Sequence, residues 1–475
     1  MKRKLLTILL SIACIFSLAF GLTACIRQKQ KYTIHYSLNN DGASYSVNRV
    51  VAYQGYSLVD AKVAATYRGL PVTSIRRSAV HSEIIKSITL PDSITSIDEQ
   101  AFTYYPALKS IKVASGNNFF HSTGNCLIET ASRTMIVGCY SSVIPSDGSV
   151  TSIGNSAFSG CTSLKSISIP DSVTSIGESA FYSCYDLASV TFGNNLESIG
   201  EWAFARCKSL KSISIPDSVT SIGGGAFSGC TSLKSLSIPD SVTSIGYDAF
   251  SGCSDLASVT FGNNVTSIGN YAFSGCTTLK SISIPASVTS IGSSLFADCS
   301  GLESITVSKD NTAYQGIANC LIDMKSGTLI SGCKNSIIPA VITTIGEWAF
   351  SGCTGLVSID IPDGVTDIMD YAFSGCTGLE NVVLPAGLLK IHDRAFYNCE
   401  SLKSVTIPAS AKYIGYYVFD KCKSLESAIF KNCEGWVFMN SNPFVDILSS
   451  ELADPATAAN YLKENRAMLR PEYDY

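Results

Sequence analysis

The sequence predicts a repeat solenoid built mostly from short β-strands. Three observations predict it. A residue pair, Ala-Phe or a close variant, returns at a spacing of 23 residues over long stretches of the chain. The apolar pattern Leu-x-x-Ile-x-Ile precedes most of these pairs, as in "LKSISI". A fixed period of roughly 20–29 residues with such a core is typical of leucine-rich repeats.

The pairs mark 13 copies of the repeat. The regular series starts at Ala157-Phe158 and recurs with its first residue at positions 180, 203, 226, 249, 272 and 295, then at 349, 372, 395 and 418. Earlier copies lie at Ala101-Phe102 and, in a degenerate form, at Ala79-Val80. Repeats of this kind extend a fold without adding domains.

One copy, "SLKSISIPDSVTSIGESAFYSC", shows how the repeat works. Leu164, Ile167 and Ile169 alternate as in a strand, and Pro170 ends the strand because proline donates no ladder hydrogen bond. Val173 and Ile176 belong to the segment in which the chain runs back on the other side of the repeat, and Phe181 places a ring in the core. Full burial of such a set gains roughly 10–20 kcal/mol. Ordering one copy costs roughly 35 kcal/mol, so the copies are expected to fold only when stacked.

These phrases resemble the BspA-like leucine-rich repeat family of surface proteins. The resemblance is carried by "LKSISIPDSVTSIGESAF", "LKSLSIPDSVTSIGYDAF" and "LVSIDIPDGVTDIMDYAF", and it covers residues 57–430. It implies surface proteins that adhere to host extracellular-matrix proteins and to other microbes. The slot that holds Asn or Cys in the commonest leucine-rich repeats holds Ser172 here, so the usual asparagine ladder is not expected.

Residues 1–24 are predicted to be a secretory signal peptide, since three basic residues precede an apolar run from Leu5 to Leu22. The alternative is a membrane-spanning helix of about the minimum length. The ending "LTAC" resembles the bacterial lipoprotein signal, which implies cleavage before Cys25 and lipid attachment to its thiol. Two or more acyl chains suffice for stable anchoring, so the protein is expected outside the cell, held to a membrane by lipid.

The remaining chain divides into a solenoid and two caps. Residues 25–56 are expected to hold the lipidated cysteine, a tether and a β-hairpin cap around Asp41-Gly42. Residues 57–430 form the solenoid, with longer hairpin-containing insertions near 114–145 and 308–338. In residues 431–475, Asp454 and Pro455 predict the start of a C-terminal capping helix.

Cysteines recur at one phase of the repeat, three residues before the strand Leu. A disulfide chain or a metal ladder is one interpretation, but no C-x-x-C motif occurs. The favoured interpretation is a small, buried, weakly polar residue in a tight corner. These cysteines are Cys161, Cys184, Cys207, Cys230, Cys253, Cys276, Cys299, Cys353, Cys376, Cys399 and Cys422.

Two further cysteine pairs have equal spacing, in "CLIETASRTMIVGC" and "CLIDMKSGTLISGC". A two-residue turn at Ser326-Gly327 would set Cys320 opposite Cys333, close enough for a disulfide. Disulfides Cys126–Cys139 and Cys320–Cys333 are therefore one hypothesis, and two free core-facing thiols the other.

The sequence offers no support for catalysis or for a cofactor. The four histidines stand in unrelated contexts, and Asp360, Asp363 and Asp367 lack a calcium-loop pattern. The glycines of "SIGGGAFSG" lack the lysine of a phosphate loop. Charged residues make up 15% of the chain and the net charge is −4, which argues against nucleic-acid binding.

The outward positions of the main strands are the candidate contact surface. They are mostly Ser or Thr, which either keep a crowded sheet soluble or form a low-charge platform for a protein or glycan. A specific contact is expected in the irregular stretch 353–430 or at the insertions. The candidate ligand residues are Ser166, Ser189, Ser212, Ser235, Ser258, Ser281, Ser304, Ser358, Asp360, Asn381 and Ser404.

The sequence thus predicts a monomeric, non-enzymatic, lipid-anchored protein of the cell surface. Its expected partner is an extracellular protein of the host matrix or of another microbe. The alternative is a glycan-binding module for nutrient capture.

Overall fold

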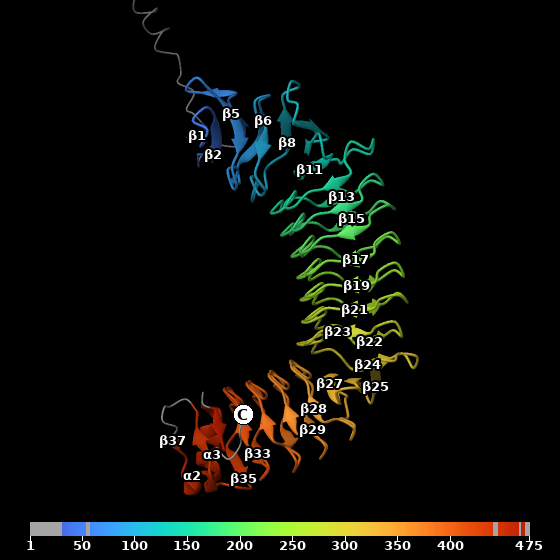
Figure 1. Cartoon of the computed structure of the whole chain (residues 1–475), viewed down its shortest axis with the longest axis vertical. Helices are drawn as coiled ribbons and strands as arrows, with labels where there is room; N and C mark the ends of the chain where they lie inside the picture. Colours follow the sequence, from blue (N-terminus) through green and yellow to red (C-terminus); the bar gives the residue numbers. More distant parts are fainter. Residues whose placement is uncertain (1–30, 54–57, 440–444, 465–466, 471–475) are drawn as a thin grey trace, which may run out of the picture.

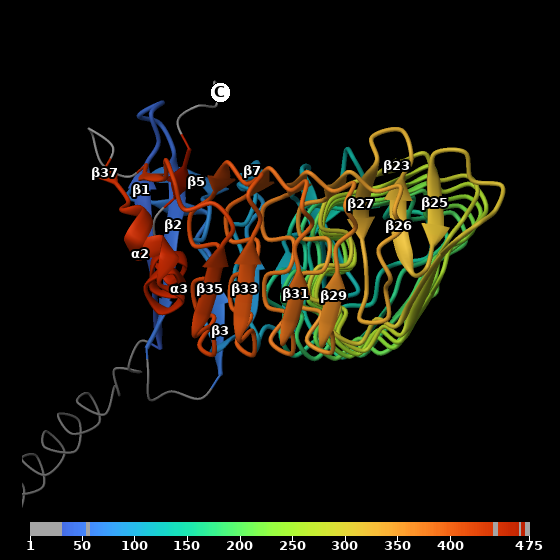
Figure 2. The same cartoon turned by 90° about the horizontal axis from the view of Figure 1, so that it is seen from below.

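The computed structural model describes residues 31–53, 58–439, 445–464 and 467–470. Cys25 and the predicted signal peptide lie outside these residues. The described chain forms a solenoid curved into an arc, with the two caps at its ends (Figure 1, Figure 2). Most turns of the solenoid, called rungs below, carry a main strand and a short second strand, as the predicted fold class requires.

The main strands alternate one buried residue between two outward ones, because side chains of a strand point to opposite faces. Ile167, for example, is 5% exposed, whereas Ser166 and Ser168 on either side are exposed. The main strands are β3 (Val59–Lys62), β6 (Ile85–Leu90), β8 (Ser110–Val113), β13 (Ser166–Ser168), β15 (Ser189–Thr191), β18 (Ser235–Ser237), β20 (Ser258–Thr260), β22 (Ser281–Ile284), β24 (Ser304–Val307), β29 (Ser358–Asp360), β31 (Asn381–Val383), β33 (Ser404–Ile407) and β35 (Ser427–Phe430).

The second strands are mostly Ser-Ile pairs, and they form the longer sheets. They are β5 (Leu70–Ile75), β7 (Ser96–Ile97), β12 (Ser152–Ile153), β14 (Ser175–Ile176), β16 (Ser198–Ile199), β17 (Ser221–Ile222), β19 (Ser244–Ile245), β21 (Ser267–Ile268), β23 (Ser290–Ile291), β28 (Thr344–Ile345), β30 (Asp367–Ile368), β32 (Lys390–Ile391) and β34 (Tyr413–Ile414). Two ten-stranded sheets contain most of them.

The main strands pair only in twos and one group of three. The expected long hydroxyl-lined sheet is therefore interrupted, and Ser212 lies in a rung without an assigned main strand. Backbone hydrogen bonds still join neighbouring rungs along this side, such as Lys234 N to Lys211 O at 3.2 Å. The continuous ladder runs instead along the second strands.

Phenylalanine rings stack along the core. Phe227, Phe250 and Phe273 follow one another at centroid distances of 5.4 Å with nearly parallel planes. All three are fully buried. Each rung thus buries its ring against its neighbours, which is why one rung cannot fold alone.

Both insertions form antiparallel hairpins that replace part of a rung. The first contains β9 (Phe120–Thr123), β10 (Cys126–Glu129) and β11 (Thr134–Val137). The second contains β25 (Tyr314–Ile317), β26 (Cys320–Asp323) and β27 (Thr328–Ser331). In each, the last strand joins the next rung in parallel, β11 to β12 and β27 to β28.

The arc of the solenoid changes direction near both insertions (Figure 1). At the second insertion the rungs come together at their Ala-Phe turns. There the backbone N–H of Asp298 donates directly to Ser351 O at 2.9 Å, so the rungs on either side of the second insertion touch. On the second-strand side, β23 pairs only with β21, and the sheet begins again at the hairpin. The buried core is also divided here into two clusters. The two hairpins therefore act as wedges that give the arc its curvature.

Both ends are capped as the fold class predicts. At the N-terminus β1 (Tyr32–Leu38) and β2 (Tyr45–Ala52) form an antiparallel hairpin, and Asp41 Oδ1 accepts from Ala43 N in its turn. The short strand β4 (Thr66–Tyr67) pairs with β5. The C-terminal cap contains β36 (Val437–Phe438), β37 (Val445–Asp446), α2 (Ser449–Ala453), α3 (Pro455–Lys463) and β38 (Met468–Leu469).

The predicted start of the capping helix is confirmed. Asp454 is the N-cap of α3 and its carboxylate accepts from Thr457 N at 2.9 Å. Leu452 and Leu462 are buried, and α3 packs on β35. The helices cover the last rung and so close the core.

Candidate ligand-contact surface

The outward residues of the main strands form one surface along the solenoid, called the main-strand face below. All the candidate ligand residues lie on it. Most are exposed, and Ser304 is half-buried. Strand pairing sets them in register, Ser166 beside Ser189, Ser235 beside Ser258, and Ser281 beside Ser304.

The second insertion separates the face into two arms, a first arm ending at Ser304 and a second arm starting at Val357. On the second arm Ser358 stands beside Asn381, and Asp360 beside Val383. Ser404 stands beside Ser427 on the following pair of strands. The structure thus brings the candidate residues together within each arm.

Charged residues line the rim where each main strand begins. On the first arm this rim is mostly basic, with Lys165, Lys211, Lys234 and Lys280 all exposed, and Glu303 Oε1 at its end lies 3.4 Å from Lys280 Nζ. On the second arm it is mixed, and Lys403 Nζ contacts Glu380 Oε2 at 2.8 Å. Exposed pairs of this kind stabilise a fold by only about 0–1 kcal/mol. The rim therefore contributes more to the charge of the surface than to its stability.

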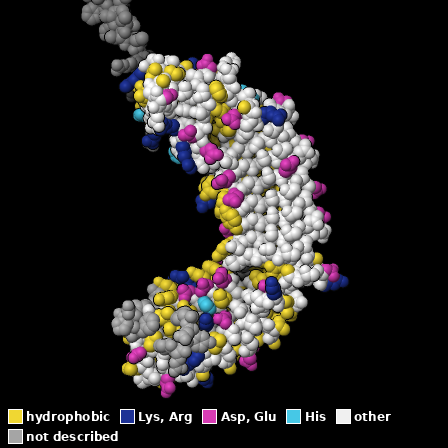
Figure 3. Space-filling model, in the orientation of Figure 1, with side chains coloured by type: hydrophobic (Ala, Val, Ile, Leu, Met, Phe, Trp, Pro, Cys, Tyr) yellow, Lys and Arg dark blue, Asp and Glu magenta, His cyan; other side chains and the backbone are white. Residues whose placement is uncertain are grey.

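Exposed apolar side chains distinguish the second arm. Val357, Val383 and Ile429 are 57%, 59% and 46% exposed, at outward positions that hold Ser, Thr, Lys or Ala through most of the first arm. In Figure 3 the middle of the arc is mostly white, whereas hydrophobic and charged atoms gather toward both ends of the arc and along its inner edge. The irregular motifs "LVSIDI", "LENVVL" and "LESAIF" carry this signal, but the three residues were not among the candidate residues.

The recurrent cysteines are buried free thiols. Each of those in the regular stretches donates its thiol to the carbonyl of the phenylalanine in the preceding rung, as Cys253 Sγ does to Phe227 O at 3.3 Å. Cys184, Cys230 and Cys376 repeat this contact at 3.1–3.2 Å. The interpretation as a small, weakly polar corner residue is confirmed, and the corner includes a thiol–carbonyl ladder.

Burial suppresses the reactivity of these thiols. It raises the pKa of the Cys253 and Cys376 thiols to about 12 from an ordinary value of 9.0. A thiol is nucleophilic and binds metals only as the thiolate. At neutral pH the thiols of Cys253 and Cys376 therefore stay protonated, and their role is structural.

The two hypothesised disulfides are absent, and the structure has the alternative, free core-facing thiols. Cys126, Cys139, Cys320 and Cys333 are all buried free thiols. The predicted hairpin register was wrong, because Asp323 pairs with Thr328 and a bulge follows, so that Leu321 stands opposite Ser331. That register places Gly332, not Cys333, across from Cys320. The Cys320 thiol instead donates to the backbone, 3.5 Å from Ile337 O.

The histidines and other side chains that could take part in catalysis do not gather at one place in the described part of the chain. His81 and His121 contact the hydroxyls of Thr103 and Thr130, and His392 Nε2 lies 3.7 Å from Asp367 Oδ1. Within the described ranges, no three His, Cys, Asp or Glu side chains are grouped so that they could hold a metal ion. Nor does any helix in the described part of the chain have the length and apolar character to cross a membrane.

The sequence matches the family model described as "BspA type Leucine rich repeat region", in six copies. The matched residues are 70–131, 136–255, 203–321 and 330–444, which is most of the chain. No curated protein is significantly similar in sequence.

Several solved structures are similar. A leucine-rich repeat protein from Bacteroides ovatus is 28% identical, with 83% of this chain and 92% of that chain covered and a TM-score of 0.47. A leucine-rich cell surface protein from Faecalibacterium prausnitzii is 23% identical, with 85% and 94% covered and a TM-score of 0.42. The pneumococcal vaccine antigen PcpA is 18% identical, with 86% and 82% covered and a TM-score of 0.47.

Proposed function

The chain belongs to the family of BspA-type leucine-rich repeat proteins, and on this premise we propose that it is a non-enzymatic surface protein that binds protein ligands through the second arm of its main-strand face. The observation that carries the proposal is the exposure of Val357, Val383 and Ile429 on that arm. Burying such a side chain in an interface gains roughly 1.5–3 kcal/mol.

The surroundings of these residues suit a protein partner. Asp360, Glu380 and Lys403 lie beside the apolar side chains and supply charges for a polar rim. Interfaces between proteins combine an apolar centre with such a rim. The ligand is expected to be an extracellular protein of a host matrix or of another microbe.

The alternative is a glycan ligand, for which the serine and threonine columns of the first arm would supply hydroxyls. These columns form a flat surface without ring faces, whereas small-ligand sites are usually concave and lined by apolar and aromatic groups. Protein binding is therefore the favoured function.

The test uses a panel of immobilised extracellular-matrix proteins, before and after enzymatic deglycosylation. The triple variant Val357→Ser, Val383→Ser and Ile429→Thr gives the second arm the composition of the first. The matched control on the first arm carries Ser168→Ala, Ser237→Ala and Ser283→Ala. All six positions point outward, so both variants should fold.

The second-arm variant should bind at least about 10-fold more weakly, which corresponds to about 1.4 kcal/mol. The control variant should bind normally, and deglycosylation should have no effect. Loss of binding in the control alone, or on deglycosylation, would show glycan recognition instead.

The proposed location is the cell surface, with a lipid on Cys25. The motif "LTAC" supports this, as does the polar stretch "IRQKQK" that follows it. Cys25→Ala should release the protein from membranes into the medium. Retention of this variant in the membrane fraction would contradict the lipid anchor.

A further inference from the structure

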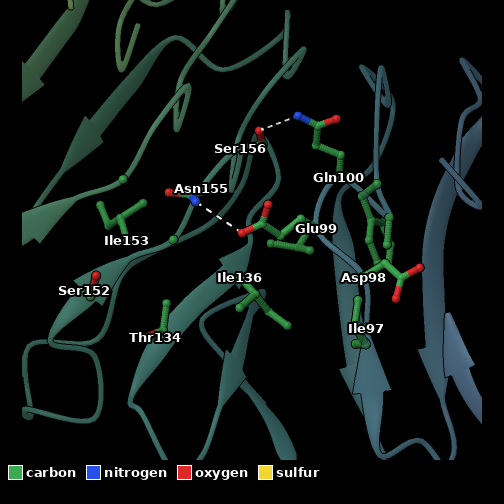
Figure 4. Close-up of a pocket in the computed structure, with 15 residues that line it drawn as sticks. Ile97, Asp98, Glu99, Gln100, Thr134, Ile136, Ser152, Ile153, Asn155 and Ser156 are labelled. Carbon is green, nitrogen blue, oxygen red and sulfur yellow. Dashed lines mark hydrogen bonds between the residues drawn. The ribbon is translucent and has the colours of Figure 1, made fainter. Parts of the chain in front are cut away.

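The two insertions leave equivalent clefts in the second-strand sheet. β7 pairs only with β5, and β23 only with β21, so each presents one unpaired edge at an insertion. A cleft of about 320 Å³ lies between β7 and β11, and another of about 320 Å³ lies between β23 and β27. Figure 4 shows the first cleft, with Ile97 on one side and Thr134 and Ile136 on the other.

The free edge of β7 carries hydrogen-bond acceptors. In a regular rung the carbonyls of Thr174 and Ile176 accept from the next rung, from Glu197 N at 2.9 Å and Gly200 N at 2.8 Å. Thr95 and Ile97 hold the equivalent positions in the rung of β7, within "TSIDEQAF". No donor among the described residues reaches either carbonyl. Both acceptors therefore point to where the next rung would stand.

The edge of β23 shows that a donor also points into the cleft. The Ile291 N–H donates to the hydroxyl of Tyr314 at 2.9 Å, and this hydroxyl takes the place of the missing strand. The edge donor at the second cleft is thus already bonded to the protein's own side chain.

The first cleft lacks this hydroxyl. Its hairpin docks in the same way, because Asn117 Nδ2 donates to Ile94 O and Asn311 Nδ2 to Val288 O, both at 2.9 Å. Three residues after each asparagine, however, the first hairpin has Phe120 where the second has Tyr314. Phenylalanine cannot accept the Ile97 N–H, so the edge of β7 keeps one donor and two acceptors for an incoming strand.

The lining of the first cleft fits an extended peptide. Ile97, Ile136 and Ile153 provide an aliphatic floor. Asp98 and Glu99 stand at the rim, and Glu99 Oε1 accepts from Asn155 Nδ2 at 3.2 Å across the cleft (Figure 4). The one aromatic residue of the lining, Phe102, is buried. An aliphatic floor beside free backbone groups suits a strand better than a sugar, which would stack on ring faces.

We propose that an extended segment of a protein ligand docks in the first cleft as an added strand on β7. Its backbone N–H groups donate to Thr95 O and Ile97 O, and one of its carbonyls accepts the Ile97 N–H. One small apolar side chain contacts Ile136, and a basic side chain lies near Asp98. Strand addition at a free edge is a common mode of peptide recognition. The inference rests on the proposed function in taking a protein as the ligand, and it adds a second contact at the first insertion, apart from the second arm.

The test selects random linear seven-residue peptides, displayed on phage, against the immobilised full chain. Ile136→Trp fills the first cleft, and Ile330→Trp is the matched control in the second. Phe120→Tyr adds the hydroxyl that accepts the edge N–H at the second cleft, a change that retains the ring. Circular dichroism checks the fold of each variant.

Enriched peptides should bind Ile136→Trp at least 10-fold more weakly and Phe120→Tyr several-fold more weakly, while binding Ile330→Trp normally. Hydrogen exchange of the Ile97 amide should slow when peptide is bound. The proposal is overturned if no peptide is enriched, if enriched peptides bind Phe120→Tyr as well as they bind the unaltered protein, or if the Ile97 amide exchanges unchanged.

These outcomes are separate from those of the proposed function. The second-arm triple variant changes residues of the main-strand face and leaves the cleft intact. Loss of matrix-protein binding in that variant, with normal binding in Ile136→Trp and Phe120→Tyr, would refute the cleft while supporting the face.

Discussion

The thiol ladder predicts a specific loss of stability in alkali. Burial holds the Cys253 thiol neutral, with a pKa of about 12 in the folded protein against an ordinary value of 9.0. Between these values the unfolded chain releases a proton that the folded chain keeps. The stability is therefore complete below about pH 9, and it falls as pH rises toward the folded pKa.

The size of the effect follows from the ordinary pKa. Ionisation of a thiol with a pKa of 9.0 lowers the free energy of the unfolded chain by about 1.4 kcal/mol at about pH 10. At about pH 8 the effect is under about 0.1 kcal/mol. A unit of several rungs loses this amount for each thiol whose pKa is raised by burial, as those of Cys253 and Cys376 are, and the sum is a large share of the stability of a typical domain.

Cys253→Ser isolates one thiol. A serine hydroxyl can keep the hydrogen bond to Phe227 O, and it does not titrate in this range. The assay is urea unfolding at about pH 8 and about pH 10, followed by tryptophan fluorescence and circular dichroism. Between these pH values the variant should lose about 1.4 kcal/mol less than the unaltered protein, because titration of tyrosine and lysine cancels in the comparison. An equal loss in both proteins would refute the account of the ladder.

Three other predictions concern the interior of the rungs. Phe250→Ala should destabilise the protein by about 3–5 kcal/mol through the cavity it leaves, whereas Val357→Ala at the surface should cost under about 0.5 kcal/mol; urea unfolding compares them. Gly246→Ala should cost at least about 1–3 kcal/mol, because its Cβ would lie 2.4 Å from Gly224 N. Thermal melts beside Gly116→Ala, whose Cβ meets only Asp92 side-chain atoms at 3.6 Å, check this, and equal melting temperatures would contradict it. Thiol titration in denaturant without reductant should find every cysteine from 126 to 433 free, and two or four missing thiols would restore the disulfide hypothesis.

The sequence was enough to locate the candidate contact surface, but not to identify which of its residues stay exposed to a ligand. The spacing of Ser166 and its equivalents placed them outward and in register, because alternation within a strand is a local property. The sequence motifs of the second arm also differed visibly from the rest. That Val357, Val383 and Ile429 stay uncovered depends on what packs over them, and only the folded chain decides that.

The two clefts could not be predicted from the sequence either, because they too depend on what packs beside them in the folded chain. A free strand edge is defined by the absence of a neighbour, and the neighbour comes from a distant part of the chain. The hairpin register failed because the turn spans residues 324–327, so that Asp323 pairs with Thr328, and a bulge between Leu321 and Ile322 shifts the pairing again. The contrast between Phe120 and Tyr314 gained meaning only when Tyr314 was found bonded to Ile291.

The sequence by itself determined the repeat, the stacking of rungs, the inward and outward residues and the helix start at Asp454. It could do so because rungs of equal length stack in register and each rung repeats the same local pattern. The tertiary structure decided that the second strands carry the longer sheets, that the two hairpins bend the solenoid, and that the cysteines bond to phenylalanine carbonyls. These features depend on contacts between residues far apart in the chain, which no periodicity encodes.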